Sequence, residues 1–185
     1  MLFRDHSDLQ GQHAFLGASK YHWINYDDIK LAEVYRNELS KQLGTELHEI
    51  ASQCIKHGIK LQGHKKTLSA FVNDAIGYRM NSEVVLFYSY NCFGTADAIS
   101  FENGLLRIHD LKTGVIPAHF EQLRIYAALF CLEYEIDPKD IRIELRIYQL
   151  DDIRYEEPDQ EEIASIMRTI VHSDKIINSI KKEDI

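Results

Sequence analysis

Apolar residues recur every three or four positions at two places in the first half of the chain, which predicts two amphipathic helices. The first begins at Asp27 or Asp28 and extends to about His57. It is either unbroken or bent near Gly44, since a glycine inside a helix costs about 1 kcal/mol relative to alanine. Its apolar positions are Tyr35, Leu39, Leu43, Leu47, Ile50, Ala51 and Cys54. Thr67 is expected to cap the second helix. The expected buried face of that helix is Leu68, Phe71, Val72, Ala75 and Ile76.

The middle of the chain is rich in β-branched and aromatic residues and predicts three consecutive strands. The first covers residues 83–90. The other two are the arms of the stretch 94–114, on either side of Asn103-Gly104, a strong short-range signal of a two-residue hairpin. The elements that follow are a helix from Pro117 to about Tyr134, a strand over 140–150 and a last helix from about 159. This order predicts an α/β (α+β) fold that contains an antiparallel three-stranded meander.

The hairpin places two acids side by side. A two-residue loop sets Glu102 opposite Leu105, and the same register sets Asp97 opposite Asp110 at the edge of an otherwise apolar face. Like charges in directly opposite positions destabilise a sheet unless a cation lies between them. Lys112 lies two residues beyond Asp110 on the same face. The pattern therefore predicts a divalent metal site with a lysine beside it.

Composition fits one globular domain over residues 1–185 with a sizeable core, because 45% of the residues are hydrophobic. Cysteines at positions 54, 92 and 131 are far apart and are expected to be buried thiols of a cytoplasmic protein. No signal-peptide pattern and no long uncharged apolar stretch is present, so no membrane association is expected.

Charge is unevenly distributed along the chain. The net charge of −8 argues against nucleic-acid binding driven by bulk electrostatics. Residues 56–66 nevertheless contain four lysines and no acid, whereas residues 151–162 are mostly acidic. Both runs are interpreted as solvated surface. If the lysines of the first run lie near a cleft, the protein could bind a nucleic-acid substrate there despite its negative net charge.

Four short motifs give the sequence a family resemblance. They are GTELH at 44–48, GTAD at 94–97, DLK at 110–112 and QLRIY at 122–126. In this order and spacing they resemble a RecB-type nuclease of the PD-(D/E)XK superfamily, similar to phage and prophage exonucleases. The resemblance implies a restriction-endonuclease-like core over about 28–150, with a mixed sheet flanked by helices. A C-terminal helix over about 159–183 would complete the domain.

The resemblance also implies a site. Hydrolysis of a phosphodiester requires an activated water, neutralised phosphoryl oxygens and a stabilised leaving group, which Mg²⁺ or Mn²⁺ supplies. The implied ligands are His48, Asp97, Asp110 and the backbone carbonyl of Leu111. Imidazole ligation favours Mn²⁺ somewhat over Mg²⁺. Lys112 would position or help to deprotonate the water. Gln122 and Tyr126 share a helix face and would contact the nucleic-acid backbone or orient the site.

The leading hypothesis is a metal-dependent DNA nuclease, an exonuclease of recombination, repair or phage DNA metabolism in the cytoplasm. Its expected partner is DNA, with a recombination or single-strand-annealing protein and a homo-oligomer as further candidates. The alternatives are a nuclease fold without catalysis that binds nucleic acid or protein, and an acidic interaction protein. Three scattered cysteines do not suffice for a four-cysteine iron-sulfur cluster, and the chain has no P-loop.

Overall fold

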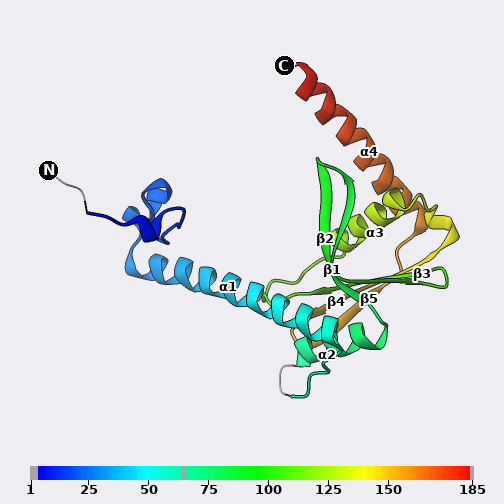
Figure 1. Ribbon diagram of the computed structural model, residues 1–185, viewed down its shortest axis with the longest axis horizontal. Coiled ribbons are helices and arrows are strands. Elements are labelled where there is room, and N and C mark those ends of the chain that lie inside the picture. The colour runs from blue at the N-terminus through cyan, green and yellow to red at the C-terminus, as the bar shows by residue number, and fades with distance from the viewer. Residues whose placement is uncertain (1–3, 64–65, 184–185) are drawn as a thin grey trace. The chain divides into compact units, whose positions relative to one another are not determined.

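The computed structural model describes residues 4–63 and 66–183 (Figure 1). The chain forms two compact units, Met1–Leu43 and Gly44–Ile185, and each is described by itself. The assignment of the whole chain to one domain stays a prediction. His64 and Lys65 of the lysine-rich run lie outside the described residues.

The first unit contains short 3₁₀ helices η1 (Ser7–Leu9) and η2 (Ala18–Asn25) and the beginning of α1 (Asp28–His57). Asp27 caps α1, because its carboxylate accepts the N–H of Lys30 at 2.7 Å. No described residue up to position 43 is fully buried. The predicted apolar stripe of α1 is therefore not a core face here: Tyr35, Leu39 and Leu43 are about half exposed.

The second unit begins within α1, which passes Gly44 unbroken. In this part of α1, Ala51, Ser52 and Ile55 are buried. They lie beside α2 (Lys66–Gly77), whose predicted core face contributes the buried residues Phe71, Val72 and Ala75. Thr67 does not cap α2 as predicted. Instead it lies inside the first turn, where its hydroxyl donates to the Asp151 carboxylate at 3.0 Å.

The second unit contains a five-stranded mixed sheet flanked by helices, which confirms the predicted fold class. The strands are β1 (Asn81–Ser89), β2 (Cys92–Glu102), β3 (Leu105–Leu111), β4 (Arg142–Gln149) and β5 (Asp152–Glu156), and they lie in this order. The first three form the predicted antiparallel meander, β4 runs parallel to β3, and β5 pairs antiparallel with β4. Strand β5 was not expected, because its segment is mostly polar. It is an edge strand, a position where charged residues are common.

Two cores pack against the sheet. One joins strand residues such as Leu106, Ile108 and Ile147 to α3 (Glu121–Glu133) and α4 (Gln160–Glu183). The other joins Leu111 and Tyr148 to the end of α1 and to α2. Since neighbouring strand residues point to opposite faces, the two cores cover opposite sides of the sheet. The described residues include no helix that is long and apolar enough to cross a membrane.

Helix α3 begins at Glu121, four residues after the predicted start at Pro117. A buried side chain from β4 explains the difference. The amide of Gln149 donates to the carbonyls of Gly114 and Ile116, each at 2.7 Å, and its oxygen accepts the N–H of Ala118 at 3.0 Å. These bonds hold the segment before α3 out of the helix. Among the cysteines, all of which are free thiols, only Cys131 is fully buried.

Candidate metal centre

Asp97 stands where β2, β3 and α1 meet. The β2–β3 ladder has the predicted register, and its last pair, Ala98 with His109, is adjacent to Asp97 and Asp110. The Oδ2 atom of Asp97 accepts the N–H of Leu111 at 2.8 Å. The same oxygen lies 3.3 Å from Nδ1 of His48. The hairpin signal therefore predicted the strand register correctly.

His48 reaches the sheet because α1 lies close to it. Ser52, one turn further along α1, hydrogen-bonds to Ser82 of β1, with 3.0 Å between the two Oγ atoms. One turn before His48, a Cβ on Gly44 would lie 2.8 Å from Oγ1 of Thr113. The glycine thus permits a close approach of α1 to the segment after β3. The hydrogen bond to Asp97 raises the pKa of His48 above its usual value, although burial acts in the opposite direction.

Glu83 is a functional candidate that sequence analysis missed. The pairs on either side of it, Ser82 with Ala98 and Val84 with Ala96, place it opposite Asp97. Its backbone φ is +53°, an uncommon conformation for a residue other than glycine. His48, Glu83 and Asp97 each offer one potential ligand atom, and these three atoms lie within 4.8 Å of one another. Desolvation and the charge of Asp97 both raise the pKa of Glu83.

Asp110 is buried, and its two oxygens differ. Oδ1 accepts a hydrogen bond from Nζ of Lys112 at 3.1 Å, whereas Oδ2 has no hydrogen-bond partner among the described residues. A buried polar atom left without a partner costs roughly 1–3 kcal/mol, and more if it is charged. Burial and the charge of Asp97 raise the pKa of Asp110, against the effect of Lys112. Asp110 also acts electrostatically on His48, but it is not part of the compact group of His48, Glu83 and Asp97.

Lys112 connects Asp110 to α3. Its Nζ donates to Oε1 of Gln122 at 2.9 Å, and Nε2 of Gln122 donates to the hydroxyl of Tyr126 at 2.8 Å. A Cβ on Gly94 would lie 2.8 Å from Cε1 of Tyr126, so the glycine of the GTAD motif gives the ring its place. Of the two predicted helix residues, Gln122 contacts the lysine directly, and Tyr126 contacts Gln122. Burial raises the pKa of the Tyr126 phenol, which keeps its hydroxyl protonated at neutral pH.

The donor set suits a hard divalent cation. The compact group contains one imidazole and two carboxylates, from His48, Glu83 and Asp97. Asp110, which acts electrostatically on His48, adds a buried oxygen without a hydrogen-bond partner among the described residues. Leu111 donates its N–H to Asp97, while the ligand role of its carbonyl stays a prediction. His109 lies on the other side of β3, where its Nδ1 is 3.2 Å from the hydroxyl of Tyr148.

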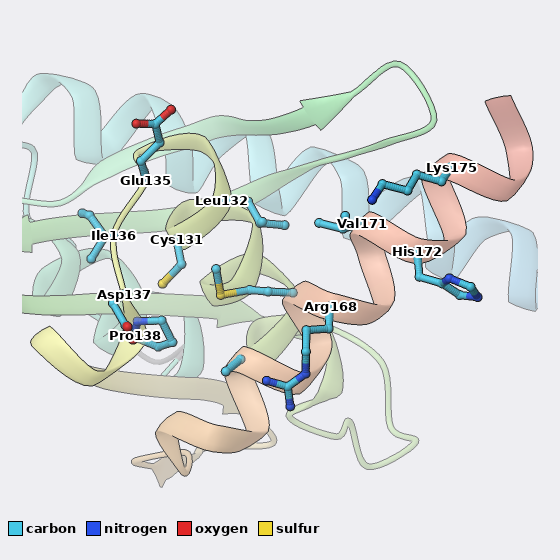
Figure 2. A pocket seen from close by; sticks show the side chains of 12 residues that line it. Cys131, Leu132, Glu135, Ile136, Asp137, Pro138, Arg168, Val171, His172 and Lys175 are labelled. Carbon is cyan, nitrogen blue, oxygen red and sulfur yellow. The ribbon is translucent and has the colours of Figure 1, made fainter.

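Two cavities of the second unit differ in their relation to this centre. A cavity of about 340 Å³ has Lys112 and Thr113 in its wall, together with Leu47, Leu68 and Leu150. A larger one, of about 680 Å³, lies between the end of α3 and α4 (Figure 2). Its acids, Glu135 and Asp137, follow α3, and its bases, Arg168, His172 and Lys175, lie on α4. None of the candidate site residues lines it. The larger cavity therefore contributes nothing to the metal centre.

Comparisons with known proteins do not assign the chain to a family. No protein-family model matches it, and no curated protein matches it significantly. The crystal structure of SSO0001 is similar with a TM-score of 0.30 and 11% sequence identity, over 71% of this chain and 86% of that chain. A similarity at this level carries no functional argument.

Proposed function

We propose that this protein is a metal-dependent nuclease that hydrolyses phosphodiester bonds of DNA. The observation that carries the proposal is the difference between the two carboxylate oxygens of Asp110. Oδ1 accepts a hydrogen bond from Lys112, whereas Oδ2 is buried without a partner among the described residues. A metal ion at Oδ2 and a water beside Lys112 would use both environments. Buried polar atoms of folded proteins usually have a hydrogen-bond partner, and a cation at this oxygen would supply one.

His48, Glu83, Asp97 and Asp110 would hold the ion. When bound, Mg²⁺ or Mn²⁺ lowers the pKa of a water and neutralises charge on the phosphoryl oxygens. Asp97 is fixed for this task by the N–H of Leu111, which occupies one lone pair of Oδ2. His48 has to lose its proton before it can bind a metal. Its contact with Asp97, at 3.3 Å, sets its orientation in advance.

Lys112 is the group that would act on the water and the scissile phosphate. Its ammonium is a compact charge held between Asp110 and Gln122 at 3.1 and 2.9 Å. The hydrogen bond from Gln122 to Tyr126 fixes the orientation of that amide, which presents its oxygen to the lysine. Gln122 and Tyr126 therefore act as positioning residues for the cation.

The resemblance of the four motifs extends the proposal to an exonuclease of recombination, repair or phage DNA metabolism that acts in the cytoplasm. Lys56 also supports a polyanionic substrate, because this exposed first residue of the lysine-rich run acts electrostatically on Glu83. Lys56 thus supplies a positive charge that acts at Glu83 in a chain whose net charge is −8.

The test is cleavage of end-labelled linear DNA and of circular DNA by the purified protein, with Mn²⁺ or with a chelator. We expect cleavage with Mn²⁺ only, loss of cleavage in Lys112→Ala, and resistance of the circle. The matched control is Lys139→Ala, which removes an exposed lysine beyond the centre. Equal activity of Lys112→Ala and wild type, or cleavage in chelator, would contradict the proposal. DNA binding without any cleavage would favour an inactive nuclease fold.

A further inference from the structure

The β1–β2 ribbon carries an exposed apolar face. The ribbon turns away from β3, β4 and β5 (Figure 1). One side of it, with Val84, Leu86 and Ala96, packs in the core with α3 and α4. On the other side Val85 is 54% exposed, Phe87 38% and Phe93 59%, and Tyr90 in the connecting turn is 90% exposed.

The aromatic rings of this face form one patch. Phe87 and Phe93 are opposite each other in the ladder, with their ring centroids 6.4 Å apart and their planes tilted by 31°. The ring of Tyr90 lies edge-on to Phe87 at 5.4 Å. Single exposed apolar residues are common on protein surfaces, but contiguous exposed rings indicate a binding surface.

This patch is continuous with the metal centre. Residues at alternate positions of a strand share a face, so the row Glu83, Val85, Phe87 in β1 lies beside the row Asp97, Thr95, Phe93 in β2. Two proposed metal ligands stand at one end of the two rows, and the aromatic rings stand at the other. At about 3.3 Å per residue the distance from Asp97 to Phe93 is about 13 Å, the length of about four stacked nucleotides.

Polar contacts hold the ribbon in place without covering the rings. At its tip, the hydroxyl of Ser89 and the amide of Asn91 both donate to the Asp174 carboxylate of α4, at 2.6 and 2.8 Å. Further down, the N–H of Phe87 donates to Glu133 of α3 at 2.8 Å. The face is thus preorganised, which reduces the entropy lost when a ligand binds.

We propose that Val85, Phe87, Tyr90 and Phe93 form a stacking platform for the bases of a single DNA strand whose backbone leads into the metal centre. The proposal rests on the proposed nuclease function. Aromatic side chains accept any base by stacking, and the bases of a duplex are already stacked on one another and paired. A protein partner is the competing occupant. The continuity with the phosphate-cleaving centre favours the nucleic acid, because a substrate strand has to leave that centre along an adjoining surface.

The experiment measures the binding of a fluorescent 12-nucleotide single strand and of a matched duplex by anisotropy, in chelator. For Phe93→Ala and Tyr90→Ala we expect the Kd for the single strand to rise about tenfold each, with duplex binding unchanged. Phe93→Trp should bind as wild type does, whereas Phe93→Leu, which keeps apolar area but loses the ring, should resemble Phe93→Ala. Phe101→Ala, an exposed ring on the same strand outside the patch, is the control.

A second measurement separates this proposal from the nuclease function. Hydrolysis of thymidine 5′-p-nitrophenyl phosphate with Mn²⁺ needs the metal centre but no neighbouring bases. The ring variants should hydrolyse it at the wild-type rate, which would also show that they are folded. Normal hydrolysis together with unchanged single-strand binding in the ring variants would overturn the platform alone and leave the face to a protein partner. No Mn²⁺-dependent hydrolysis by the wild type, of this ester or of DNA, would overturn the nuclease function.

Discussion

The carboxylate of Asp97 accepts the backbone N–H of Leu111 at 2.8 Å, so one side chain of β2 fixes the last residue of β3. The bond lies just beyond the last backbone pair of the two strands, Ala98 with His109. It therefore combines a structural role with the proposed role as a metal ligand. Substitutions that differ in hydrogen bonding and in charge can separate the two.

Asp97→Asn keeps an oxygen that can accept from Leu111 but loses the negative charge. In chelator we expect its free energy of unfolding to lie within about 1 kcal/mol of wild type, whereas Asp97→Ala should lose roughly 1–3 kcal/mol by leaving the N–H of Leu111 without a partner. Urea unfolding measures both. Equal stability of the alanine and asparagine variants would mean that the hydrogen bond contributes nothing.

Asp110→Asn should stabilise the metal-free protein at neutral pH. Burial and Asp97 raise the pKa of Asp110 in the folded state. Such a group stabilises the fold below its unfolded pKa, near 3.9, and this stabilisation is lost as the pH rises through the raised folded pKa. At pH 7.5 the wild type therefore carries the cost of a buried charge that asparagine avoids. Melting curves in chelator should show a higher Tm for the variant.

The same substitution should remove most of the stabilisation that Mn²⁺ provides. Metal binding to the folded state raises the Tm by mass action, by an amount that grows with ion concentration. In a Mn²⁺ titration the wild-type Tm should rise steadily and that of Asp110→Asn only slightly. A variant with a lower Tm in chelator and an undiminished gain from Mn²⁺ would show that Asp110 is not a ligand.

Metal affinity should increase with pH because His48 has to be neutral to bind. Its pKa is raised above 6.5 by the hydrogen bond to Asp97, so the protonated form persists above that pH in the metal-free protein. The stabilisation from the His48–Asp97 pair is full below about 6.5 and is lost as the pH rises through the raised value. Calorimetric titration with Mn²⁺ between pH 6 and 8.5 should show affinity that rises and then levels off. In His48→Asn this part of the pH dependence should disappear.

Gln122→Ala should slow hydrolysis through Lys112 rather than through binding. Loss of one hydrogen bond that holds the ammonium should lower kcat about tenfold with little change in KM, since a cation slightly out of place affects the transition state most. Lys112→Ala should lower kcat by at least about a hundredfold. In the double variant the Gln122 effect should vanish. Additive losses would indicate that Gln122 acts independently of the lysine.

The sequence was sufficient where interactions are local. Asn103-Gly104 determines the register of β2 and β3, and the structure confirms that register from Ala98 and His109 to the turn. Asp97 and Asp110 come directly after the last pair of this ladder. The motif resemblance implied that Gln122 would contact the nucleic acid or orient the site, and the structure places its amide oxygen 2.9 Å from Nζ of Lys112. Helix α1 and its close approach at Gly44 were also predictable, because a glycine inside a helix needs a reason.

The remaining features depend on contacts between distant segments. Glu83 reaches the centre through the register of β1 with β2 and through its positive φ. The Tyr90-Asn91 turn carries no strong sequence signal for that register. The residues around Glu83 carry none for the positive φ. The late start of α3 depends on Gln149, a residue far along the chain. Strand β5 is defined by its pairing with β4, since its own composition is that of a surface loop.

The central claim is that His48, Glu83, Asp97 and Asp110 hold one divalent cation that Lys112 uses for hydrolysis. The most direct measurement is a Mn²⁺ titration followed by electron paramagnetic resonance of the free ion, with cleavage of a single DNA strand measured on the same samples. We expect one tightly bound Mn²⁺ per chain in the wild type and in Lys112→Ala, with cleavage by the wild type only. Asp97→Asn and Glu83→Gln should bind the ion at least about tenfold more weakly, as loss of one ligand charge implies. A folded wild type that binds no Mn²⁺, or one whose affinity neither substitution changes, would contradict the account.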